Sequence, residues 1–231
     1  MKKSVKCKSL LVSVLIISMM MLSFPMAVHA ASYFQGGTIH LVQVSHTDIG
    51  WADGPSTEIS EDNACIDNSM NLFGQSSTLK YVSEDMLHLK QYMDNRTQAQ
   101  VDALKVQVNN GRYEFGAAYT SPYEELLSSE QMARQFYFGR KWFKSLFPSQ
   151  DAPVYYAVDP PERALQMSQL LQKAGVPYEF TSRYYNQVPG VPNDSITKWA
   201  SPDGSSTLTF AYTHYGELYG YMVIWVFLIL I

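Results

Sequence analysis

Residues 79–119, LKYVSEDMLHLKQYMDNRTQAQVDALKVQVNNGRYEFGAAY, contain the alternation that decides the fold class. The two ends are rich in aromatic and aliphatic residues, whereas the middle carries apolar residues at helical spacing. Asn109-Asn110-Gly111 is a typical signal for the end of a helix. The segment therefore predicts strands at 79–83 and 112–119, with helices at 85–94 and 97–108 between them.

The same alternation of strand and helix continues on both sides of this segment. Ser128 and Gln131 fit a capping box that opens a long helix. The further predicted elements are a strand at 39–44, a helix at 56–73, a helix from 128 to 147, a strand at 154–158, a helix at 163–173, a strand at 178–182, a loop at 186–206 and a strand at 207–216. This order is typical of an α/β protein with a parallel sheet or a barrel surrounded by helices, whose sites lie at the carboxyl ends of the strands.

The first 30 residues have the composition of a signal peptide. An apolar run over 10–21 and the small-x-small sequence Val28-His29-Ala30 follow a basic start, which contains Lys2, Lys3, Lys6 and Lys8. About twelve apolar residues are too few to span a bilayer comfortably, which argues against the alternative of a membrane anchor. We therefore expect a secreted or extracytoplasmic protein that is free of the membrane once the signal is cleaved.

The remaining sequence is acidic. Loss of the four lysines of the signal segment lowers the formal net charge from −4 to −8, and no basic patch indicates a nucleic-acid partner. Residues 221–231, YMVIWVFLILI, form an almost wholly apolar tail. This tail fits a buried strand, a short membrane tail, or the product of a frameshift or truncation.

His46 and Asp48 lie in VSHTDIGW (44–51), just after the first predicted strand. Side chains at positions i and i+2 of an extended segment point the same way, so the two can be offered to a single ion. An imidazole and a carboxylate without a thiolate suit Zn²⁺, with other divalent metals as substitutes. The alternative is a strand-end histidine that is hydrogen-bonded to a nearby carboxylate.

Two further residues extend this candidate site. Asp159 follows the strand at 154–158 and could serve as a third ligand and as an attacking carboxylate, whose pKa a cation and Arg183 would lower. Trp51 could present a flat apolar face to a sugar ring, or it could be a core residue under the loop. Acidic residues at other predicted strand ends could equally be solvated loop residues; these are Glu84, Glu124 and Glu125.

Three stretches of the chain, taken in order, carry a family resemblance. HTDIGW, GRYEFGAAYTSPYEELLSSEQMARQFYFGRKWFK and YYAVDPPERALQMSQLLQKAGVPYEFTSR resemble the N-terminal catalytic domain of glycoside hydrolase family 38, the retaining α-mannosidases. The resemblance extends over about residues 39–216 and assigns 31–220 to this domain. It implies a seven-stranded β/α barrel, one zinc ion and a mannose-containing oligosaccharide or glycoconjugate as substrate.

The resemblance also implies roles for individual residues. Zinc would be bound by His46, Asp48 and Asp159, and Asp159 would also be the nucleophile. Trp51 would line the mannose pocket, and Arg183 would steady the nucleophile.

The chain departs from the family pattern at several points. Asp159-Pro160-Pro161-Glu162 replaces the usual D-x-F-G, and no residue clearly matches the acid/base carboxylate. In the family, a fourth zinc ligand and the remaining barrel strands lie beyond the last residue of this sequence, so we expect an incomplete domain that is inactive by itself.

Two other functions fit parts of the sequence. A metal-dependent polysaccharide deacetylase would need an H-x-x-x-H pair, and none occurs. A secreted carbohydrate-binding pseudoenzyme would keep the pocket of Trp51 without hydrolysing the sugar.

Overall fold

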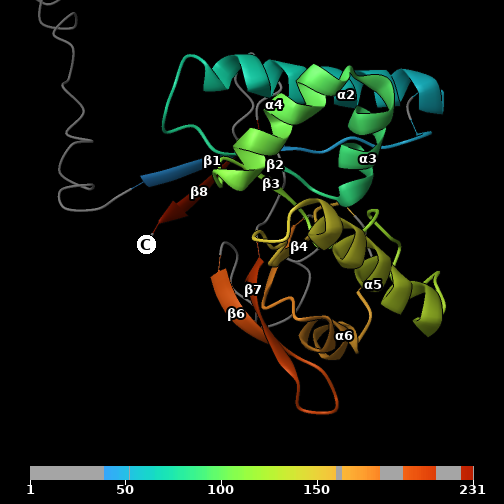
Figure 1. Cartoon of the computed structure of the whole chain (residues 1–231). Helices are drawn as coiled ribbons and strands as arrows, with labels where there is room; N and C mark the ends of the chain where they lie inside the picture. Colours follow the sequence, from blue (N-terminus) through green and yellow to red (C-terminus); the bar gives the residue numbers. More distant parts are fainter. Residues whose placement is uncertain (1–38, 52, 160–162, 183–194, 212–224, 231) are drawn as a thin grey trace, which may run out of the picture. The chain divides into compact units, whose positions relative to one another are not determined.

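The computed structural model describes residues 39–51, 53–159, 163–182, 195–211 and 225–230. Strands and helices alternate along most of this length (Figure 1). In chain order the elements are β1 Ile39–Ser45, α2 Pro55–Phe73, β2 Tyr81–Ser83, α3 Met86–Asn95, α4 Gln98–Asn109, β3 Tyr113–Phe115, α5 Ser129–Leu146, β4 Val154–Ala157, α6 Met167–Ala174, β5 Tyr178–Thr181, β6 Ser195–Ala200, β7 Ser206–Ala211 and β8 Trp225–Leu230. None of the helices in these ranges is long and apolar enough to cross a membrane.

The strands form two sheets, with the orders β3-β2-β1-β8 and β4-β5-β7-β6. β1, β2 and β3 pair in parallel, as do β4, β5 and β7, while β6 runs antiparallel to β7. The predicted α/β fold with parallel strands is therefore confirmed. The described residues do not show a closed seven-stranded barrel.

Strands β2 to β5 are buried over most of their length, as expected for parallel strands covered by helices, whereas β6 alternates between partly buried and exposed residues. The larger apolar cluster includes Ile66 of α2, Phe115 of β3, Phe143 of α5 and Leu171 of α6. A smaller cluster, which we call the inner cluster, consists of Val44, Val82, Tyr156, Val158 and Phe180. Ala117, just after β3, donates its backbone N–H to the carbonyl of Val154 in β4 at 2.8 Å.

Local signals correctly set most helix boundaries. Ser128 and Gln131 form the predicted capping box of α5, and Thr97 forms an equivalent box with Gln100 at α4. Gly111 (φ 65°) and Gly175 (φ 71°) adopt the left-handed conformation where α4 and α6 end. These backbone angles favour glycine, which explains why Asn109-Asn110-Gly111 could be recognised as the end of a helix from the sequence.

Two predictions were wrong. Residues 195–200 lie in the antiparallel strand β6 rather than in a loop, because they pair with β7 over its whole length. The helix expected from residue 163 begins only at Met167, because Arg163 and Ala164 are held by the carboxylate of Glu124. Residues 225–230 of the apolar tail form strand β8, and the origin of the tail stays a prediction. The predicted signal segment, residues 1–30, lies outside the described residues.

Candidate functional site

The loop after β1 carries the first two candidate ligands. β1 ends at Ser45, and His46 continues the alternation that places Val44 in the inner cluster. The His46 side chain is 10% exposed and that of Asp48 is 45% exposed. Because β1 ends at Ser45, both residues lie at the carboxyl end of a parallel strand, as the sequence predicted.

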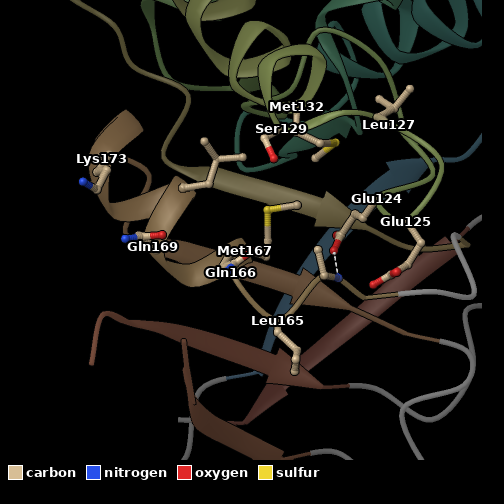
Figure 2. Close-up of a pocket in the computed structure, with 12 residues that line it drawn as sticks. Glu124, Glu125, Leu127, Ser129, Met132, Leu165, Gln166, Met167, Gln169 and Lys173 are labelled. Carbon is tan, nitrogen blue, oxygen red and sulfur yellow. Dashed lines mark hydrogen bonds between the residues drawn. The ribbon is translucent and has the colours of Figure 1, made fainter. Parts of the chain in front are cut away.

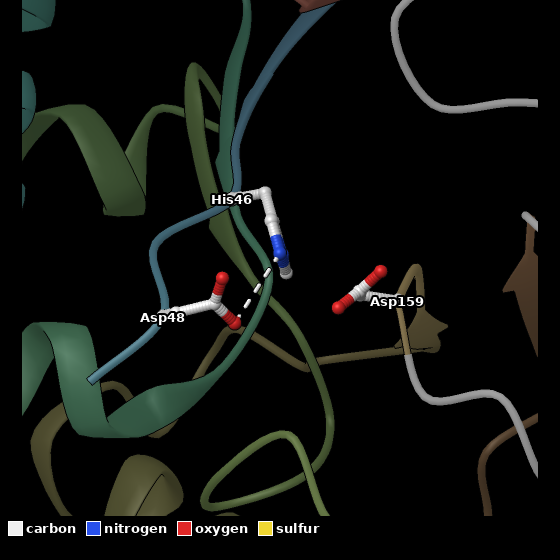
Figure 3. A group of neighbouring side chains, drawn as sticks. All are labelled: His46, Asp48 and Asp159. Carbon is white, nitrogen blue, oxygen red and sulfur yellow. Dashed lines mark ion pairs between the residues drawn. The ribbon is translucent and has the colours of Figure 1, made fainter. Parts of the chain in front are cut away.

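Asp159, two residues after the end of β4, meets this pair. His46, Asp48 and Asp159 each offer one ligand atom, and these atoms lie within 4.8 Å of one another. Figure 3 shows the imidazole of His46 between the two carboxylates. No other trio of His, Cys, Asp or Glu side chains meets this condition in the part of the chain that the structure describes.

The geometry of this group fits a transition-metal ion. His46 Nε2 lies 3.6 Å from Asp48 Oδ1. Two ligand atoms bound tetrahedrally to zinc at about 2.0–2.1 Å are about 3.4 Å apart, so small movements would bring both into coordination. One imidazole nitrogen and two carboxylates form a donor set that zinc accepts.

Glu84, which follows β2, orients the imidazole of His46 through Nδ1, the ring nitrogen that does not face Asp48. His46 Nδ1 lies 2.9 Å from both Glu84 carboxylate oxygens, and Ser121 Oγ donates to Glu84 Oε1 at 3.1 Å. A proton on Nδ1 would be donated to Glu84, which leaves the lone pair of Nε2 facing the ion position. Glu84 is 1% exposed. The alternative of a solvated loop residue is thus wrong for Glu84.

The charges around His46 favour its protonated form in the metal-free protein. Burial lowers the pKa of His46, but the neighbouring carboxylates of Glu84 and Asp48 outweigh this effect and raise the pKa from 6.5 to about 10. The site thus attracts positive charge. A metal ion that binds Nε2 would have to displace a proton.

Trp51 lies further along the same loop and is 81% exposed. The alternative of a core tryptophan under the loop is therefore wrong. The loop is held instead by Glu58 of α2, whose carboxylate accepts hydrogen bonds from the backbone N–H groups of Gly50, Trp51 and Asp53. Sequence reasoning missed Glu58. Its only signal was an acidic residue in the first turn of a predicted helix.

Glu124 is buried and paired, so the solvated alternative is wrong for it too. Its side chain accepts from Tyr155 Oη at 3.1 Å and from the backbone N–H of Ala164 at 2.6 Å, and it lies 2.9 Å from Arg163 Nη1. Arg163 also pairs with Glu179. This network anchors the chain at Arg163 and Ala164, which follow Asp159 by four and five residues.

A pocket of about 440 Å³ borders this network. Figure 2 shows Glu124 and Glu125 at one end of it and the sulfur atoms of Met132 and Met167 near its middle. Glu125 is exposed, in agreement with the solvated alternative. Arg183 lies outside the described residues, so its predicted role stays a prediction.

Comparison with known protein families shows which family the chain belongs to. Residues 36–222 match the family model of the glycosyl hydrolases family 38 N-terminal domain. The chain belongs to glycosyl hydrolase family 38. The resemblance seen in the sequence is thereby confirmed. A comparison with curated proteins gives no match.

Solved structures share the fold of this family 38 chain. An α-mannosidase from Enterococcus faecalis V583 superposes with a TM-score of 0.66 at 20% identity, covering 74% of this chain and 19% of its own. A family 38 protein from E. faecalis gives 0.59 at 20% identity, with 77% and 19% covered. A 4-α-glucanotransferase from Thermococcus litoralis gives 0.56 at 15% identity, with 74% and 27% covered. The chain thus spans about a fifth of the length of the two E. faecalis proteins.

Proposed function

We propose that this chain is the metal-binding and nucleophile-bearing part of a secreted, retaining α-mannosidase that acts on mannose-containing glycans. The observation that carries the proposal is the meeting of His46, Asp48 and Asp159, which come from the ends of two different strands. Family membership supplies the reaction class. In the whole protein we expect the sheets to belong to a closed seven-stranded barrel.

His46, Asp48 and Asp159 would hold a zinc ion. When bound, the ion would act as a Lewis acid toward hydroxyl groups of the mannose. Glu84 would fix the ring orientation of His46 and the proton on its Nδ1. Trp51, with its exposed ring, would offer a flat surface to the C–H face of the sugar.

Asp159 would perform the first chemical step. Its carboxylate attacks the anomeric carbon, a bond forms between that carbon and the Asp159 oxygen, and the bond to the leaving glycosidic oxygen breaks as an acid group protonates that oxygen. Water then attacks the anomeric carbon from the face opposite Asp159, its proton passes to the conjugate base of the acid group, and the bond to the Asp159 oxygen breaks, which frees the carboxylate. Two inversions give net retention of configuration.

Metal analysis of the purified chain tests the ligand set. The wild type should bind close to one zinc ion per chain, and Asp159→Asn should bind much less. Asp102→Asn, which changes an exposed carboxylate on α4, is the matched control and should bind as the wild type does. Equal zinc content in the wild type and Asp159→Asn would reject Asp159 as a ligand.

Assay with an aryl α-mannoside, with and without added zinc, tests the chemistry in a protein that includes the rest of the catalytic domain. Release of the aryl group that Asp159→Asn abolishes would support the proposal. Mannoside binding without release, at any zinc concentration, would instead indicate a carbohydrate-binding pseudoenzyme.

A further inference from the structure

A single carboxylate accepts several backbone hydrogen bonds from the loop that carries the first candidate ligands. Glu58, in the first turn of α2, accepts the backbone N–H of Gly50 on Oε2 and those of Trp51 and Asp53 on Oε1, the last two at 3.2 and 3.0 Å. Glu58 is 3% exposed. An ionised carboxylate has room for several donors, so three backbone amides and one buried acid satisfy one another.

The two functional side chains of this loop differ in exposure. Asp48 is 45% exposed at its side chain and pairs with His46, whereas Trp51 is 81% exposed. An exposed side chain such as that of Trp51 depends largely on its backbone for its position, and the same backbone determines whether Asp48 can reach His46. That backbone turns at Gly50, whose φ of +86° is a conformation that other residues rarely adopt. The fixed points of the turn are thus the amides that Glu58 holds.

We propose that Glu58 is a positioning residue, which sets the backbone of residues 48–51 so that Asp48 faces His46 and Trp51 faces the sugar position. The inference rests on the proposed function, because it assigns Glu58 to the metal and sugar site described above. Glu58 is not among the residues that meet as candidate metal ligands. It acts by reducing the freedom of the loop before the ligand arrives, which lowers the cost of binding.

The chemistry of the contact selects informative variants. Glu58→Gln keeps the length of the side chain, but it replaces one carboxylate oxygen with an NH₂ group. That group faces a backbone N–H and cannot accept a hydrogen bond from it. Glu58→Asp keeps both oxygens and the charge but is one methylene shorter, so it should hold the amides partly. Glu61→Gln neutralises an exposed carboxylate on the same helix and is the matched control.

We call the three hydrogen bonds from the amides of Gly50, Trp51 and Asp53 to Glu58 the clamp. Amide hydrogen exchange of the whole chain, followed by NMR, measures the clamp directly. We expect the amides of Gly50, Trp51 and Asp53 to exchange at least about tenfold faster in Glu58→Gln, and by an intermediate factor in Glu58→Asp. The amides in the second half of α2 should keep their wild-type rates in both variants. Glu61→Gln should leave all of these rates unchanged.

Zinc titration by calorimetry then measures, through the zinc Kd, whether Glu58 positions the loop for metal binding. Loss of supporting contacts around a metal site typically weakens metal binding about 10–100-fold, and we expect the zinc Kd of Glu58→Gln to rise by about tenfold. Glu58→Asp should recover part of the affinity. This partial rescue separates positioning from simple loss of structure.

Three results would overturn the inference. Unchanged exchange at the three amides in Glu58→Gln would show that the clamp does not exist in solution. Faster exchange with an unchanged zinc Kd would show that the clamp does not position the ligand. Faster exchange throughout α2 in both Glu58 variants would assign Glu58 to general stability. A wild type that binds no zinc would refute the proposed function instead, and the exchange rates would still decide whether Glu58 holds the loop.

Discussion

Glu114 provides a quantitative test of the buried face of the sheets. It lies on β3 beside Val82 of the inner cluster and is hydrogen-bonded to Tyr156. Burial raises the pKa of Glu114 from 4.5 to about 7, against the opposing effects of Tyr156 and Lys80. At about 1.36 kcal/mol for a pKa difference of one, the rise from 4.5 to about 7 corresponds to about 3 kcal/mol.

The sign follows from proton binding. A carboxyl group whose pKa is higher in the folded chain binds more protons there than in the unfolded chain. The free energy of unfolding therefore falls as pH rises between the unfolded pKa of 4.5 and the folded pKa of about 7. Glu114→Gln removes this titration and keeps an oxygen that can accept from Tyr156. The variant should gain about 2–3 kcal/mol relative to the wild type between about pH 5 and about pH 8.

Urea denaturation of both proteins at the two pH values measures this change. Other titrating groups are common to both proteins, so they cancel in the difference between variant and wild type. Glu61→Gln, an exposed substitution, should give the same small difference at both pH values. A difference for Glu114→Gln that does not grow with pH would refute the reasoning.

Three other substitutions test neighbouring parts of the structure. Glu84→Gln should weaken zinc binding about 10–100-fold in a calorimetric titration, and an unchanged affinity would contradict the orienting role of this carboxylate. Gly116→Ala should lower the free energy of unfolding, measured in urea, by about 2 kcal/mol or more, because the new Cβ would overlap the Glu84 carbonyl. The control Gly54→Ala places its Cβ in open space and should lower the free energy of unfolding by less than about 1 kcal/mol. Glu124→Gln should cost about 2–4 kcal/mol in the same assay, against nearly nothing for the exposed Glu125→Gln, and equal effects would argue against the buried ion pair.

The elements that could be predicted from sequence are those whose signals are local. The capping box of Ser128 with Gln131 and the left-handed glycines at 111 and 175 each act within a few residues. β6 was missed because its residues alternate only between partly buried and exposed positions at the edge of a sheet. Its main stabilisation is its ladder with β7, which no short window of sequence reveals.

The candidate site divides in the same way. His46, Asp48 and Asp159 could be proposed because each follows a predicted strand, and parallel strands bring their carboxyl ends together. The supporting carboxylates could not be assigned. Glu84 reaches a histidine 38 residues away, and Glu124 meets Ala164 at a distance of 40 residues, so their roles depend on the tertiary fold.

The hydrogen bonds of Glu58 have a consequence for the order of folding. They span only five to eight residues, so the chain entropy lost in closing them is small and they can form as soon as the first turn of α2 exists. Asp159 is separated from His46 by 113 residues. One half of the site is therefore a short-range structure that can mature early, while its completion must await the slower, long-range association of β4 with the strands made before it.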